Sequence, residues 1–321
     1  MNVNDVMEVA SAVAPVFVLI ALGLLARGCG WLTKEADDSL LKLTIRLLYP
    51  AFIFNRVLAE KDLAELGNLW WPVSSGFLSI LVGFGVAWAV AVALKIEGKG
   101  KREAFVFTAG IFNYGYFAIP VCEAVLFFGA GFVGKLLVFN LGVEVAIWGV
   151  GVMLLGGGAL GIGRLLNPPI LALVAALWMN HAGWANSMPD FALSSLGMVG
   201  NCAIPVGLVL IGATTLDLWR DQRSSPWSWR VVGGGVLVRL VLLPCIMLAV
   251  ARWVPFPDSA LWLSKVFVLQ AAMPAGIFAI VIARYYGANA KVAAQAMAPT
   301  ILACLVTLPV WLVVGQWFLD R

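Results

Sequence analysis

The sequence predicts an all-α membrane protein with ten transmembrane helices arranged as two inverted five-helix repeats. Composition is the first observation: of 321 residues, 62% are hydrophobic and only 12% charged, against about 25% charged in an average soluble domain. The mean hydropathy is +0.96. The second observation is that apolar residues come in runs of about 20, the length at which a helix crosses about 30 Å of hydrocarbon. Prolines recurring at matching positions in the two halves are the third.

Ten apolar segments are expected to cross the membrane, joined by short connections that carry most of the charge. A cytosolic globular enzyme is excluded, because so few charged residues cannot cover a water-exposed surface of this size. The segments run approximately over 9–27, 38–58, 70–94, 104–129, 132–157, 167–183, 191–216, 230–252, 259–283 and 292–318.

Four pairs of prolines, each separated by 154 or 155 positions, indicate an internal repeat. Each half holds five spans, so the second half must enter the membrane from the opposite side, an inverted topology common in secondary transporters. The glycine run at 156–158 is the expected linker, which divides the chain into a first repeat, 1–158, and a second, inverted repeat, 159–321. The pairs are Pro15 with Pro169, Pro50 with Pro205, Pro72 with Pro226, and Pro120 with Pro274.

The distribution of positive charge predicts the orientation in the membrane. Loops on one side hold twelve Lys and Arg residues, and those on the other hold five. Because positive loops stay in the cytoplasm, both termini are expected outside, in a multi-pass protein of the cell (inner) membrane. Asp5 and Glu8 stand where a signal peptide carries basic residues, so the first apolar run is expected to remain as a span.

Spans four and nine carry residues that interrupt helices. Span four contains Asn113, Tyr114, Gly115 and Pro120 near its middle, and span nine contains Gln270, Pro274 and Gly276. Proline removes a backbone hydrogen bond and glycine loosens the helix. A single proline can merely kink a continuous span, but matching positions in inverted halves favour two broken helices that cross at mid-membrane. The positive half-helix N-termini would suit a carboxylate there, and exposed carbonyl groups could equally hold a cation.

Further polar residues within the spans are candidates for coupling or for structural pairing. Asn140 and Glu144 are four residues apart and share a helix face, and Glu123 follows Pro120 by about one turn. For the two glutamates, proton or cation coupling and a structural pair are both open.

Arg46 and Asn201 hold corresponding positions, each four residues before the proline of its span. Arg46 could reach the membrane surface by snorkelling or contact substrate. Lys265 and Arg239 could snorkel or pair. Lys and Arg are scattered through short loops, so no nucleic-acid partner is expected. No metal-ligand spacing, nucleophile motif or phosphate-binding loop occurs, so neither an enzyme nor a cofactor is expected.

Short motifs along nearly the whole chain resemble the auxin efflux carrier family, a relative of the bile acid–sodium symporters. Tyr49 departs from the leucine that the family often has before the proline of span two. The matching segments are Tyr49-Pro50-Ala-Phe-Ile-Phe, Asn113-Tyr-Gly-Tyr-Phe-Ala-Ile-Pro120-Val, Asn167-Pro-Pro-Ile170, Asn201-Cys-Ala-Ile-Pro205-Val-Gly-Leu and Ala271-Ala-Met-Pro274-Ala.

The resemblance implies a scaffold of spans one, two, six and seven and a transport domain of the other six. Substrate would bind between them near Pro120 and Pro274, and elevator movement of the transport domain would give alternating access. Members carry organic anions such as auxin, malate or malonate, and plant members form dimers through the scaffold. Sodium coupling, known in the bile acid symporters, is doubtful because span nine has Gln270 but no acidic residue. Proton coupling or movement driven by the membrane potential stays open.

The sequence therefore predicts a secondary transporter for a small organic anion, lying in lipid as a homodimer through its scaffold. A ligand-gated channel or a membrane sensor for the same ligands is the alternative. The predicted substrate-binding residues are Asn113, Tyr114, Gly115, Pro120, Asn201, Gln270, Pro274 and Arg46, with Glu123, Asn140 and Glu144 as coupling or structural residues.

Overall fold

The computed structural model describes residues 3–60, 63, 69–129, 131–156, 166–222 and 227–320. The regular structure of these residues is helical, apart from one isolated β-bridge. The repeat boundary expected between residues 158 and 159, and Pro226 of the proline pairs, lie outside the described residues.

Six helical stretches among the described residues are long and apolar enough to cross a membrane. Each coincides with one of the ten apolar segments of the sequence, which makes this a multi-pass, all-helical membrane protein. The stretches are Asp5–Gly28, Trp70–Ala93, Phe132–Leu154, Asp190–Asp217, Trp229–Trp253 and Ala290–Leu319.

Three of the long stretches are single helices, α1, α4 and α17, and the other three are divided into shorter helices. Span seven is interrupted at Cys202, three residues before Pro205. The helices are α1 (Val3–Gly28), α4 (Trp70–Ala93), α7 (Phe132–Ala146), α8 (Val152–Leu154), α11 (Asp190–Asn201), α12 (Ala203–Gln222), α13 (Trp229–Leu237), α14 (Leu243–Trp253) and α17 (Ala290–Leu319).

The remaining four apolar segments contain shorter helices. Two of these segments are split into a pair of helices, and this division is what leaves them below the length of a simple span. The helices are α2 (Lys34–Leu43), α3 (Tyr49–Leu58), α5 (Lys101–Gly110), α6 (Ala118–Ala124), α10 (Pro168–His181), α15 (Leu263–Ala272) and α16 (Phe278–Tyr285).

Three π-helical turns lie inside these helices: η1 (Thr44–Leu48), η4 (Ile147–Gly151) and η6 (Val238–Leu242). Two of them come directly before a helix with proline in its first turn, Pro50 in α3 and Pro244 in α14. A proline lacks the N–H that would continue the regular hydrogen-bond pattern, so the preceding turn widens. Two short 3₁₀ turns, η5 (Trp184–Ser187) and η7 (Asp258–Ala260), lie in the connections.

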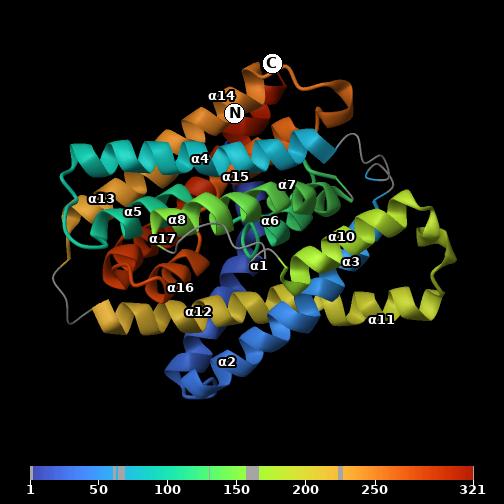
Figure 1. Ribbon diagram of the computed structural model, residues 1–321, viewed down its shortest axis with the longest axis horizontal. Coiled ribbons are helices and arrows are strands. Elements are labelled where there is room, and N and C mark those ends of the chain that lie inside the picture. The colour runs from blue at the N-terminus through green and yellow to red at the C-terminus, as the bar shows by residue number, and fades with distance from the viewer. Residues whose placement is uncertain are drawn as a thin grey trace.

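The helices pack as two groups. The α1–α12 group contains α1, α2, α3, α10, α11 and α12, in which α1 packs on α12 and α3 packs on α10 and α11. The α4–α17 group contains α4 to α8 and α13 to α17, in which α4 packs on α5 and α7, and α17 on α13 and α15. Figure 1 shows α2, α11 and α12 along the lower edge and α4, α13 and α14 along the upper edge.

Glycines let helix backbones in both groups approach closely. Gly76 of α4 lies against the carbonyl oxygen of Phe139 in α7, and Gly142 of α7 lies against that of Val73 in α4. Gly23 of α1 and Gly212 of α12 make the same reciprocal contact in the other group. Small residues are favoured at helix contacts in lipid, where close van der Waals packing replaces the hydrophobic effect as the source of stability.

We predict that Gly76→Ala destabilises the protein, because its added Cβ would overlap the Phe139 carbonyl oxygen. Overpacking of this kind costs about 1–3 kcal/mol. Gly85→Ala on the same helix is the matched control, since a Cβ there meets nothing within 4 Å. Thermal unfolding of the two variants in detergent tests this, and equal melting temperatures would contradict the close contact.

Candidate functional site

Two helix breaks lie side by side in the middle of the protein. Helix α5 ends at Gly110, and α6 begins only at Ala118. Helix α15 ends at Ala272, and α16 begins at Phe278. We call residues 111–117 and 273–277 the paired breaks, because an antiparallel β-bridge joins Phe112 to Ala275.

Local sequence explains where each helix stops. The residue before a proline is pushed out of the helical region, and Met273, which precedes Pro274, is extended at φ −76° and ψ 142°. Ile111 is extended as well, at φ −94° and ψ 126°. Its neighbour Gly110 packs so closely on Gly83 and Phe84 of α4 that a Cβ would lie 2.8 Å from the Phe84 ring. The interruption of span four, expected among Asn113, Tyr114, Gly115 and Pro120, lies at 111–117 and does not include Pro120. Pro120 is the third residue of α6, where backbone N–H groups have no partner within the helix and proline is tolerated.

The backbone groups of the paired breaks bond to each other. The N–H of Asn113 donates to the carbonyl of Pro274 at 2.8 Å, and the N–H of Gly276 donates to that of Ile111 at 2.9 Å. Thr300 of α17 accepts from the N–H of Ala275 at 3.1 Å. An unsatisfied peptide group away from water costs several kcal/mol. The hydrogen bonds between the two breaks avoid this cost for the backbone groups that the interrupted helices leave unpaired.

Asn113 and Gln270 place unpartnered polar atoms beside these bonds. Asn113 is 5% exposed and its side-chain Nδ2 has no hydrogen-bond partner among the described residues. Gln270 is fully buried, and neither Oε1 nor Nε2 has one. Buried polar groups are normally hydrogen-bonded, so each such atom indicates strain, water or a ligand. Both residues were predicted to bind substrate, and Pro274 lies in the same backbone pairing.

Tyr114 connects the first break to helix α7. Its hydroxyl donates to Glu144 at 2.7 Å, and its carbonyl accepts from Asn140 Nδ2 at 3.0 Å. The other carboxylate oxygen of Glu144 accepts from the indole N–H of Trp148 at 2.7 Å. The helical spacing that put Asn140 and Glu144 on one face therefore brings both to Tyr114, with the Oδ1 of Asn140 left unpartnered.

Aromatic side chains of the α1–α12 group cover the same break. The rings of Tyr49 in α3 and Tyr116 are stacked with centroids 6.0 Å apart. Gly115 lies under the Tyr49 hydroxyl, which is 3.1 Å from where a Cβ would be. Tyr116 also lies directly against Gly207 of α12, where a Cβ would overlap its ring. The contribution of Tyr49 and Tyr116 was not predicted, although Tyr49 drew attention as a departure from the family pattern.

Three predicted site residues lie elsewhere. Arg46 is on the exposed face of η1, and Asn201 is exposed at the end of α11. Glu123 forms an ion pair with Arg56 of α3, which fits the structural alternative considered for it. Among the described residues, no group of three or more His, Cys, Asp or Glu side chains could hold a metal ion.

Arg239 is the most notable residue that sequence reasoning left undecided. It is fully buried, and its Nη2 donates to the carbonyl of Gln270 at 2.9 Å. A signal was present: it stands near the middle of the apolar segment 230–252, too deep for its side chain to reach the membrane surface. Lys265, grouped with it in the sequence, instead donates to the carbonyl of Phe127 at 2.9 Å.

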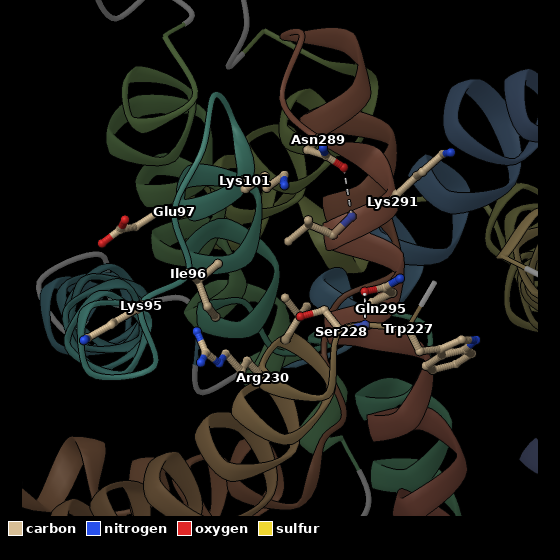
Figure 2. Close-up of a pocket in the computed structure, with 12 residues that line it drawn as sticks. Lys95, Ile96, Glu97, Lys101, Trp227, Ser228, Arg230, Asn289, Lys291 and Gln295 are labelled. Atoms are coloured by element: carbon tan, nitrogen blue, oxygen red, sulfur yellow. Dashed lines mark hydrogen bonds between the residues drawn. The ribbon is translucent and has the colours of Figure 1, made fainter. Parts of the chain in front are cut away.

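A separate basic cavity of about 480 Å³ lies away from the paired breaks, where α5, α13 and α17 begin. Figure 2 shows Lys101 and Asn289 at one end and Arg230 and Ser228 at the other. None of the predicted site residues lines it, so this cavity is distinct from the paired breaks. A smaller cavity of about 300 Å³ is lined by Asp5, Glu8 and, from the far end of α17, Gln316.

We predict that Tyr114→Phe and Glu144→Leu are energetically coupled. Removing one partner of a buried hydrogen bond to a charged group costs about 1.5–3 kcal/mol, and the double variant should lose less than the sum of the two single losses. Unfolding free energies of the four proteins give the coupling. Strictly additive losses would show that the 2.7 Å contact contributes nothing.

Comparison with known proteins agrees with the membrane character of the fold. The comparison with curated proteins returned no match. The sequence matches the family described as "Membrane transport protein" over residues 8–157 and 152–312, which together take in nearly the whole chain. The family assignment expected from the short motifs is thereby confirmed: the chain belongs to this membrane transport protein family, the auxin efflux carrier family.

Proposed function

We propose that the protein is a secondary transporter that carries a small organic anion across the cell membrane, with the substrate held at the paired breaks. The observation that carries this proposal is the concentration of buried, unpartnered polar atoms on Asn113, Asn140 and Gln270. These atoms surround the only described place where extended backbone replaces helix inside the apolar core. Irregular backbone at membrane depth is tolerated where it lines a ligand cavity, and such sites are typical of transporters.

The packing pairs support the proposed ten spans in two inverted repeats. Under the offset of 154 or 155 residues, α1 corresponds to α10 and α3 corresponds to α12. Two repeats related by symmetry require that a contact between α1 and α12 be matched by one between α10 and α3. Both contacts are present, and the two are among the most extensive helix contacts of the protein.

The division into two helix groups supports an elevator movement. In this proposal the α1–α12 group is the scaffold, through which the protein also forms a homodimer, and the α4–α17 group moves. Contacts between the groups near the paired breaks are largely aromatic: Phe17 packs edge-on against Phe117 at 5.9 Å, and Tyr49 stacks on Tyr116. Ring contacts are weakly directional compared with buried ion pairs, so one group can slide past the other at modest cost.

The charges of the two cavities support the proposed orientation in the cell membrane. Lys95, Lys101, Arg230 and Lys291 line the larger cavity, and positively charged loops stay in the cytoplasm. The acidic cavity with Asp5 and Glu8 lies beside the C-terminal end of α17, so both termini would face outside. An anion inside the cell would meet the basic surface first. The coupling ion stays open between a proton and none, with the membrane potential as the driving force.

We predict that small carboxylates raise the melting temperature of the purified protein and that Asn113→Ala abolishes this shift. A ligand that binds only the folded state stabilises it by mass action, and Asn113 supplies a buried donor beside the paired breaks. The screen uses malonate, malate and phenylacetate at several pH values, with and without sodium. Gln316→Ala, which changes an exposed residue at the far end of α17, is the control and should keep the shift. An unchanged shift in Asn113→Ala would remove this residue from the site.

Counterflow in proteoliposomes separates a carrier from the channel or sensor alternative. A carrier exchanges labelled for unlabelled substrate and therefore accumulates label transiently against its gradient, because each conformational cycle moves bound substrate. A channel shows no such stimulation, and a sensor moves no label. Absence of counterflow for a carboxylate that binds would reject transport by alternating access.

A further inference from the structure

The two buried arginines among the described residues differ in whether they form ion pairs. Arg27, 6% exposed, forms ion pairs with Asp37 and Asp217. Arg239, fully buried, forms no ion pair with any described carboxylate. Its Nε and Nη1 lack hydrogen-bond partners as well. A buried charge without a counter-charge is costly, which argues that the position of this guanidinium serves a purpose.

Arg239 contacts the first of the paired breaks and the last turn of the helix that leads into the second. It lies in the π-helical turn η6, and its Nη2 donates to the Gln270 carbonyl at 2.9 Å, in the last turn of α15. Its Cζ lies 5.4 Å from the centre of the Phe112 ring, and Phe112 is the residue that bridges to Ala275. One permanently charged side chain thus touches the end of one helix and the extended segment of the other.

Apart from Arg239, the charges at the paired breaks do not favour an anion. Helices α5 and α15 end there with partly negative carbonyl groups, and α6 and α16 begin there with partly positive N–H groups, so the helix ends largely offset one another. Glu144, held by Tyr114, adds a carboxylate nearby. Two other described basic groups already have partners: Arg56 of α3 pairs with Glu123, and Lys265 of α15 donates to the Phe127 carbonyl.

We propose that Arg239 is the specificity-determining charge of the transport site. Its positive charge acts through space and makes the site prefer carboxylates over uncharged molecules of the same shape. This inference rests on the proposed function and deepens it. Arg239 is a positioning residue: its contacts are with the Phe112 ring and the Gln270 carbonyl, and its charge acts on the site through space. For a substrate carboxylate about 8 Å from the guanidinium, in a medium with an effective dielectric constant of about 20, this charge favours binding of the anion over a neutral molecule about 30-fold.

The test measures the ratio of dissociation constants for an amide and its parent acid. The probes are phenylacetate with phenylacetamide and malonate with malonamide, measured on the purified full-length protein by calorimetry. In Arg239→Gln we expect the preference for the acid to fall about 30-fold for the monocarboxylate. Arg252→Gln, which removes an exposed arginine from α14, should leave the ratio unchanged.

A purely structural role for Arg239 would weaken the acid and the amide equally and leave their ratio as in the wild type, and that result would overturn the inference. Gln270→Glu provides a second test that keeps the arginine. Its carboxylate would neutralise Arg239 and should lower the ratio. An unchanged ratio in Gln270→Glu would also overturn the inference, even if Arg239→Gln fails to fold.

The outcome in the wild type distinguishes this inference from the proposed function. If the wild-type protein binds neither acid nor amide from any pair, the proposed site for carboxylates fails. If it binds acid and amide equally well, the role of Arg239 fails while the transport site stands. A strong acid preference that Arg239→Gln abolishes supports both.

Discussion

The need to satisfy backbone polar groups where there is no water shapes this protein more than any other constraint. Elsewhere in the described spans, helices satisfy it internally. At the paired breaks, two extended segments satisfy it by bonding to each other, Asn113 to Pro274 and Gly276 to Ile111. Further hydrogen bonds hold these two segments in place. Thr300 accepts from the N–H of Ala275, and Tyr114 bonds to Glu144 through its hydroxyl and to Asn140 through its carbonyl.

Such a pairing also creates a chemical opportunity. Because the backbone groups of the two segments bond to each other, the nearby side chains are not needed as their partners. Asn113 and Gln270 keep polar atoms without partners in a buried, apolar environment. In that setting a hydrogen bond or a charge acts more strongly than in water. Arg239, which contacts Phe112, and Glu144, which accepts from Tyr114, place groups of both signs of charge at the first break.

Much of this arrangement was readable from residue types and spacing. Composition and run length indicated the membrane, and Pro274 correctly placed the second break because proline forces the residue before it out of the helix. The first break takes in Asn113, Tyr114 and Gly115 of the predicted interruption but not Pro120. A proline in the first turn of a helix is harmless, and the chain instead leaves the helix at Gly110, whose close packing on α4 depends on a helix 26 residues earlier in the sequence.

Arg239 shows the limit most clearly. Its depth in an apolar segment indicated that it could not be an ordinary surface arginine, but whether it pairs or stands alone depends on which helices surround it. Local sequence determined the helices, the end of α15 before Pro274 and the spacing that puts Asn140 and Glu144 on one face, because these depend on interactions within a few residues. Only the tertiary structure decided that Gln270, Phe112 and Arg239 meet, because contacts between residues on different helices are set by the packing of whole helices.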